Sequence, residues 1–147
     1  MKAVLDTNIW LDWLVFDDPG VAPLVRRAQA GRLLLVGTAR MRDEWQDVIA
    51  RERFGLNAAA RALALERYDA HLRLCPAAPL CTLSCRDPDD QMFIDLAVAE
   101  SAQWLVTKDK ALLALARHAA RRHGLMIARP DAPALRAALN DDIGEPL

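Results

Sequence analysis

The chain has 147 residues, 53% of them hydrophobic, and its 19 Lys and Arg against 20 Asp and Glu leave a net charge of −1. This size and composition predict one soluble domain, which buries about two-thirds of the surface of its unfolded chain. The balanced charge excludes a protein that is held to nucleic acid by bulk positive charge. Its apolar segments are shorter than the roughly 20 residues of a membrane span.

Residues 1–6 lack the apolar run of about 7–15 residues that a secretion signal needs, so we expect a cytoplasmic protein. Cys75, Cys81 and Cys85 are odd in number, and their spacings of six and four residues fit neither a disulfide framework nor a CxxC zinc site. We therefore expect three reduced thiols.

Short apolar runs without alternation predict strands that are covered on both faces. They lie at 2–5, 33–37, 104–106 and 125–128, with 80–83 as a candidate for a further strand. Helical patterns cover roughly 20–30, 39–54, 57–73, 89–102, 109–122 and 131–140. Strands that alternate with helices predict an α/β fold around a mostly parallel sheet of about five strands. We expect one domain over 1–139 and a loose C-terminal tail over 140–147.

Acidic residues follow the predicted strands. Asp6 follows the first strand and Asp109 follows strand 104–106, while Asp90 begins the helix before that strand. Ligands of open parallel sheets bind at the carboxyl ends of the strands, where these acids are expected to meet.

Each acid also has a purely structural interpretation. Asp87 can cap a helix with Pro88 in its first turn, which leaves Asp90 as a capping carboxylate. Asp109 can cap a helix that begins at Lys110. Thr7 or Asn8 can likewise cap a helix that begins at Ile9.

Glu44 is not explained by a cap. It lies inside the helical pattern 39–54, beside the apolar stripe of Met41, Trp45, Val48 and Ile49. A carboxylate at such a packed face needs a hydrogen-bond network, an Arg such as Arg40 or Arg51, or a bound cation.

The convergence of Asp6, Glu44, Asp90 and Asp109 predicts a metal site. Two carboxylates about 5 Å apart repel by roughly 3 kcal/mol at an effective dielectric of 20, so several of them need a cation. An all-oxygen ligand set indicates Mg²⁺ or Mn²⁺ rather than zinc or copper. Such a cation can activate water for phosphodiester hydrolysis.

Four segments in this order resemble a PIN domain, and most closely the bacterial VapC-like toxins of type II toxin–antitoxin pairs: 4–8 (VLDTN), 38–49 (TARMRDEWQDVI), 87–90 (DPDD) and 107–109 (TKD). The resemblance covers about residues 2–128. It implies an α/β/α sandwich and a divalent-metal-dependent ribonuclease with Asp6, Glu44, Asp90 and Asp109 in its acidic site. It also implies an RNA substrate, an antitoxin partner that masks this site, and a homodimer.

Within this resemblance Asn8 and Thr107 support the acidic site. Trp45 stands where the family more often has Leu, which concerns packing rather than chemistry. The doublet Asp89-Asp90 leaves the third acid ambiguous by one place. Asp90 is preferred because it shares a helix face with Phe93, and Asp87 is the next candidate for an added ligand.

Cations around the acids are candidates for contacts with RNA phosphates. They are Arg40, Arg42, Lys108 and Lys110, although solvated surface charge explains them equally well. The basic run 117–123 lies at the far end of its helix from Asp109, so we assign it to the surface or to the helix dipole.

Two other functions fit the sequence less well. A phosphatase of the haloacid-dehalogenase type needs a second Asp two places after the first, where this chain has Asn8. A PIN-like module that serves only protein interaction is the stronger alternative, but degenerate members lose acids and all four positions are filled here.

Overall fold

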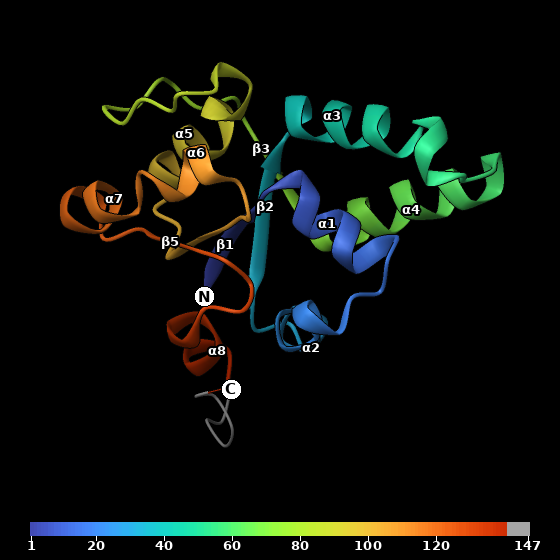
Figure 1. Ribbon diagram of the computed structural model, residues 1–147, viewed down its shortest axis with the longest axis horizontal. Coiled ribbons are helices and arrows are strands. Elements are labelled where there is room, and N and C mark those ends of the chain that lie inside the picture. The colour runs from blue at the N-terminus through green and yellow to red at the C-terminus, as the bar shows by residue number, and fades with distance from the viewer. Residues whose placement is uncertain (141–147) are drawn as a thin grey trace.

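The computed structural model describes residues 1–140 and contains a five-stranded sheet between two layers of helices (Figure 1). The strands are β1 (Lys2–Leu5), β2 (Leu34–Thr38), β3 (Leu72–Cys75), β4 (Trp104–Val106) and β5 (Met126–Ala128). They are ordered β3-β2-β1-β4-β5, and every neighbouring pair is parallel. The predicted α/β fold with a central parallel sheet is confirmed.

Eight α-helices and three short 3₁₀ helices connect the strands in the described part of the chain. The α-helices are α1 (Thr7–Leu14), α2 (Ala22–Gln29), α3 (Ala39–Ile49), α4 (Ala58–His71), α5 (Gln91–Ala99), α6 (Lys110–Leu113), α7 (Ala116–His123) and α8 (Pro133–Asn140). The 3₁₀ helices are η1 (Pro19–Val21), η2 (Glu52–Phe54) and η3 (Pro88–Asp90).

The helices cover both faces of the sheet. Figure 1 shows α1, α3 and α4 on one side of it and α5, α6 and α7 on the other. Successive residues of β1 enter different cores, since Ala3 and Leu5 pack with the first group of helices and Val4 packs with the second. This two-sided burial explains why the strands appear in the sequence as unbroken apolar runs.

The predicted strand at 80–83 was wrong, and the predicted helix 57–73 ended two residues too late. The chain leaves α4 at His71 and forms the edge strand β3, in register with β2 from Leu35↔Leu72 to Thr38↔Cys75. Residues 80–83 lie after Pro79 and have no strand partner. The predicted helix 109–122 is divided into α6 and α7.

Within residues 1–140, none of the helices combines the length and the apolar character needed to cross a membrane. Cys75, Cys81 and Cys85 are free thiols, and burial raises the pKa of Cys81 and Cys85, which keeps them protonated. The predicted tail lies outside the described residues from 141 onward.

Candidate active site

The four predicted carboxylates line one pocket, which we call the acid pocket. Asp6, Glu44, Asp90 and Asp109 surround a space of about 160 Å³, together with Thr7, Asn8, Val48, Arg51 and Arg53. Asp6 directly follows β1, and Asp109 lies three residues beyond the end of β4. The strand order changes direction between these two neighbours, at the position where ligands of open parallel sheets bind.

Thr107 positions two of these acids. Its Oγ1 donates a hydrogen bond of 2.7 Å to Oδ2 of Asp6 and accepts one of 2.9 Å from the backbone N–H of Asp109. Thr107 is fully buried and Asp6 is only 4% exposed. The Asp6 backbone N–H also donates to the Val106 carbonyl at 3.0 Å. Both chain segments are therefore held at fixed positions beneath the pocket.

Two of the acids cap helices, as the structural interpretation predicted, and one of these two also lines the acid pocket. Asp109 caps α6, since its Oδ2 accepts from the Leu112 N–H at 3.3 Å. Asp87 caps η3 by accepting from the Asp89 N–H at 3.0 Å. Asp90 makes no side-chain cap bond at the start of α5 and lines the pocket instead.

Asp87 and Asp89 are exposed and do not line the acid pocket. Of the three neighbouring acids, Asp90 is therefore the one that the structure places with Asp6 and Asp109.

Glu44 enters the pocket from α3. Its Oε2 accepts a hydrogen bond from Oγ1 of Thr7, the first residue of α1. Within residues 1–140, neither Arg40 nor Arg51 forms an ion pair with Glu44. The hydrogen bond from Thr7 is thus the compensation that the structure provides for this carboxylate.

The carboxylates influence one another electrostatically. Burial, a hydrogen bond to the Asp109 side chain and the charges of Asp6 and Asp109 raise the pKa of Asp90 to about 7. Burial also raises the pKa of Asp6, and the hydrogen bond from Thr107 opposes this effect. The pocket therefore concentrates negative charge in a confined volume.

The four predicted cationic residues differ in their surroundings. Arg42 makes a bidentate pair with Asp69 at 2.8 and 2.9 Å. Lys108 pairs with the buried Asp12 at 2.6 Å. Arg40 and Lys110 are exposed.

Arg51 and Arg53 line the acid pocket. Arg51 was expected only as a possible partner of Glu44, and Arg53 was not expected at the site. A signal for Arg51 was present, because Glu44, Val48 and Arg51 are spaced i, i+4 and i+7 in the predicted helix 39–54, although α3 itself ends at Ile49. Arg53 also lies over the Phe54 ring at 4.8 Å.

Comparison with known families identifies the fold. The family model of the PIN domain matches residues 2–111, which is more than half of the chain. The chain belongs to the PIN domain family. The predicted family is thereby confirmed.

A solved structure resembles this PIN domain. It is the crystal structure of VapBC2 from Rickettsia felis bound to a DNA fragment from their promoter. The match has a TM-score of 0.60 and 17% sequence identity, and it covers 88% of this chain and 98% of that chain. At this identity the similarity concerns the fold. No curated protein matches the sequence.

The donor set of this PIN domain suits a hard divalent cation. Among residues 1–140, no three His, Cys, Asp or Glu side chains are arranged closely enough to hold a metal ion as they stand. The pocket nevertheless offers carboxylate oxygens, which Mg²⁺ and Mn²⁺ prefer. A cation there would offset the repulsion that raises the pKa of Asp90.

Proposed function

We propose that this PIN domain is a divalent-metal-dependent endoribonuclease that hydrolyses RNA phosphodiester bonds. The observation that carries the proposal is the convergence of Asp6, Glu44, Asp90 and Asp109 in one pocket. Family membership adds support, since PIN domains are typically nucleases. Arg51 and Arg53, which line the same pocket, suit a polyanionic substrate.

Asp6, Asp90 and Asp109 would hold Mg²⁺ or Mn²⁺, and Glu44 would bind the metal or orient water. When bound, the cation polarises a phosphoryl oxygen and lowers the pKa of water, which favours hydrolysis.

The remaining residues position these groups. Thr107 holds Asp6 and the backbone of Asp109 through its two hydrogen bonds. Thr7 holds the carboxylate of Glu44. The exposed amide of Asn8 at the pocket edge can hydrogen-bond a phosphate or a water.

Arg51 and Arg53 are the first candidates for phosphate contacts because they line the acid pocket. The exposed Arg40 and Lys110 are the next candidates. Arg42 and Lys108 remain candidates but would have to share their acidic partners with RNA. These contacts would hold the RNA backbone at the acids in spite of the negative charge of the pocket.

A cleavage assay with labelled single-stranded RNA tests this function. We expect cleavage with Mg²⁺ or Mn²⁺ that is abolished by EDTA and reduced at least 100-fold by Asp6→Asn, which weakens metal binding. Asp89→Asn removes an equal charge from an exposed position and should retain activity. Cleavage that survives both EDTA and Asp6→Asn would contradict the proposal.

We further propose that the protein is the toxin of a type II toxin–antitoxin pair, acting in the cytoplasm as a homodimer with a cognate antitoxin. The fold similarity to VapBC2 supports this proposal. Induced expression should arrest growth, and Asp6→Asn should relieve the arrest. Unimpaired growth with active purified enzyme would count against the toxin role while leaving the nuclease in place.

A further inference from the structure

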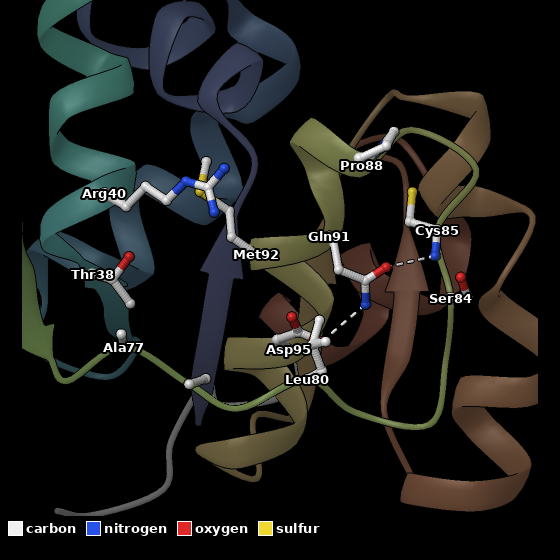
Figure 2. A pocket seen from close by; sticks show the side chains of 11 residues that line it. Thr38, Arg40, Ala77, Leu80, Ser84, Cys85, Pro88, Gln91, Met92 and Asp95 are labelled. Atoms are coloured by element: carbon white, nitrogen blue, oxygen red, sulfur yellow. Dashed lines mark hydrogen bonds between the residues drawn. The ribbon is translucent and has the colours of Figure 1, made fainter.

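A second and larger pocket lies beside the acid pocket. It encloses about 430 Å³ between α5, the start of α3 and the connecting segment 76–88 (Figure 2). Ala78, Leu80 and Met92 give it an apolar lining, and Arg40 and Asp95 give it charged groups. Pockets of this size and mixed lining are typical sites for small organic groups. We call it the base pocket.

The walls of the base pocket are held in place by side chains of α5. Gln91 Nε2 donates to the Leu83 carbonyl at 2.8 Å and to Oδ1 of Asp95 at 2.9 Å. Gln91 Oε1 accepts from the Cys85 N–H at 2.8 Å, as Figure 2 shows. Asp95 Oδ1 also accepts from the Cys81 N–H at 2.9 Å. The irregular segment 81–85 is thus tied to a helix, which pre-organises the pocket.

Two segments of the chain, α3 and the stretch from η3 to α5, contribute residues to both the base pocket and the acid pocket. Pro88 and Gln91 line the base pocket, while Asp90 between them lines the acid pocket. Arg40 lines the base pocket, and Glu44, about one turn further along α3, lines the acid pocket. The two pockets are therefore adjacent along both segments.

We propose that the base pocket binds one nucleobase of single-stranded RNA next to the cleaved bond and prefers cytosine to uracil. The inference rests on the proposed ribonuclease function. Leu80 and Met92 offer apolar contact to the base faces, and Arg40 offers a charge for the adjoining phosphate.

Asp95 provides the discrimination between the two pyrimidines. Its side chain is buried, and its Oδ1 accepts from the Cys81 N–H and from Gln91 Nε2. The Cys81 thiol also hydrogen-bonds this carboxylate. Since the two oxygens of a carboxylate can accept about four hydrogen bonds, Asp95 keeps capacity for one more donor at Oδ2. Cytosine presents an amino group at C4, which a carboxylate can accept from, whereas uracil presents an oxygen there that a carboxylate repels.

The test compares fluorescein-labelled cytidine and uridine 12-mers, whose bases differ at C4 in this respect. Anisotropy with the full chain in EDTA measures binding without cleavage. We expect the cytidine 12-mer to bind roughly three to ten times more tightly, as one hydrogen bond to a charged group allows. Asp95→Asn keeps an oxygen for the Cys81 and Gln91 backbone and amide donors but replaces Oδ2 by an NH₂ donor. It should therefore reverse the preference toward uridine.

Exposed leucines provide a matched pair of variants that do not threaten the fold. Leu80 is 81% exposed in the base pocket, and Leu63 is 55% exposed on α4. Leu80→Ser should weaken binding of the cytidine 12-mer about threefold, while Leu63→Ser should not. This pair decides the question if circular dichroism shows that Asp95→Asn does not fold.

Cleavage of the same two RNAs with Mn²⁺ separates this inference from the proposed function. Equal binding and equal cleavage of both RNAs by the wild type would overturn the base pocket and leave the ribonuclease intact. A cytidine preference that Asp95→Asn reverses, without any cleavage, would support the base pocket and count against the ribonuclease.

Discussion

At the residue scale, the carboxyl group of Asp90 makes the stability of the metal-free protein depend on pH. Its pKa in the folded protein is about 7, against 3.8 for an unperturbed Asp. Between these values the folded state holds a proton that the unfolded chain has released, so stability falls as the pH rises. Asp6, whose pKa is also raised, acts in the same direction.

We therefore expect Asp90→Asn to raise the melting temperature of EDTA-treated protein at pH 8 by roughly 2–4 °C, with little effect at pH 4. Asp90 is partly exposed, so solvent screening leaves a gain on the order of 1 kcal/mol. Thermal melts across this pH range measure the effect. Asp89→Asn is the control for the loss of one charge, and an equal gain in both variants would contradict the role of the pocket.

Asp90 also shows why the site could be predicted from the sequence only in part. Its neighbours Asp87 and Asp89 have the same chemistry, but helix geometry singled out Asp90, and the structure places Asp90 in the pocket. The partners of Lys108 and Arg42, by contrast, are Asp12 and Asp69 from distant segments. No local pattern in the sequence indicates such long-range ion pairs.

At the element scale, α3 is joined to α4 through one large side chain. Trp45 is fully buried, its ring stacks on Tyr68 at 5.6 Å between centroids, and its Nε1 donates to the Ala64 carbonyl at 3.4 Å. Trp45 directly follows Glu44 in α3. Its buried ring therefore supports the helix that carries one carboxylate of the acid pocket.

Trp45→Leu should lower the free energy of unfolding by about 2–3 kcal/mol, because it leaves a cavity between α3 and α4. Urea denaturation monitored by far-UV circular dichroism measures the change. Gln46→Leu on the exposed side of the same helix should stay within about 0.5 kcal/mol of the wild type. A loss below 1 kcal/mol for Trp45→Leu would show that the Tyr68 contact contributes little.

The elements themselves differ in how far the sequence reveals them. Strands β1, β2 and β4 lie inside the sheet and are mostly buried between helices, and their apolar runs predicted them within one residue. Strand β3 lies at the edge of the sheet with Arg73 and Leu74 exposed, so it lacks such a run. The apolar run at 80–83 instead belongs to the segment that α5 side chains hold over the base pocket, where Leu80 is exposed.

At the scale of the whole molecule, a net charge of −1 is compatible with the proposed RNA binding because the cations needed for it are local. Arg51 and Arg53 line the same pocket as the four carboxylates. Such a site would bind RNA through a few phosphate contacts rather than through bulk charge. Its affinity should therefore depend only moderately on salt concentration.

The double variant Arg51→Gln/Arg53→Gln tests this arrangement. We expect RNA affinity at low salt to fall about tenfold, because two phosphate contacts are lost. The slope of log affinity against log salt should become shallower by up to about 1.4, since each contact on a single strand contributes roughly 0.7. Fluorescence anisotropy at KCl concentrations from about 20 to about 300 mM measures both the RNA affinity and the slope.

The matched control removes two exposed arginines from α7, on the opposite side of the sheet from α3 (Figure 1). Arg117→Gln/Arg121→Gln changes the net charge equally but removes no residue of either pocket. It should therefore leave the slope unchanged. Equal slopes for the wild type and the Arg51/Arg53 variant would mean that RNA reaches the acids by another path. Equal losses in both double variants would mean that net charge, rather than the two arginines of the acid pocket, determines RNA binding.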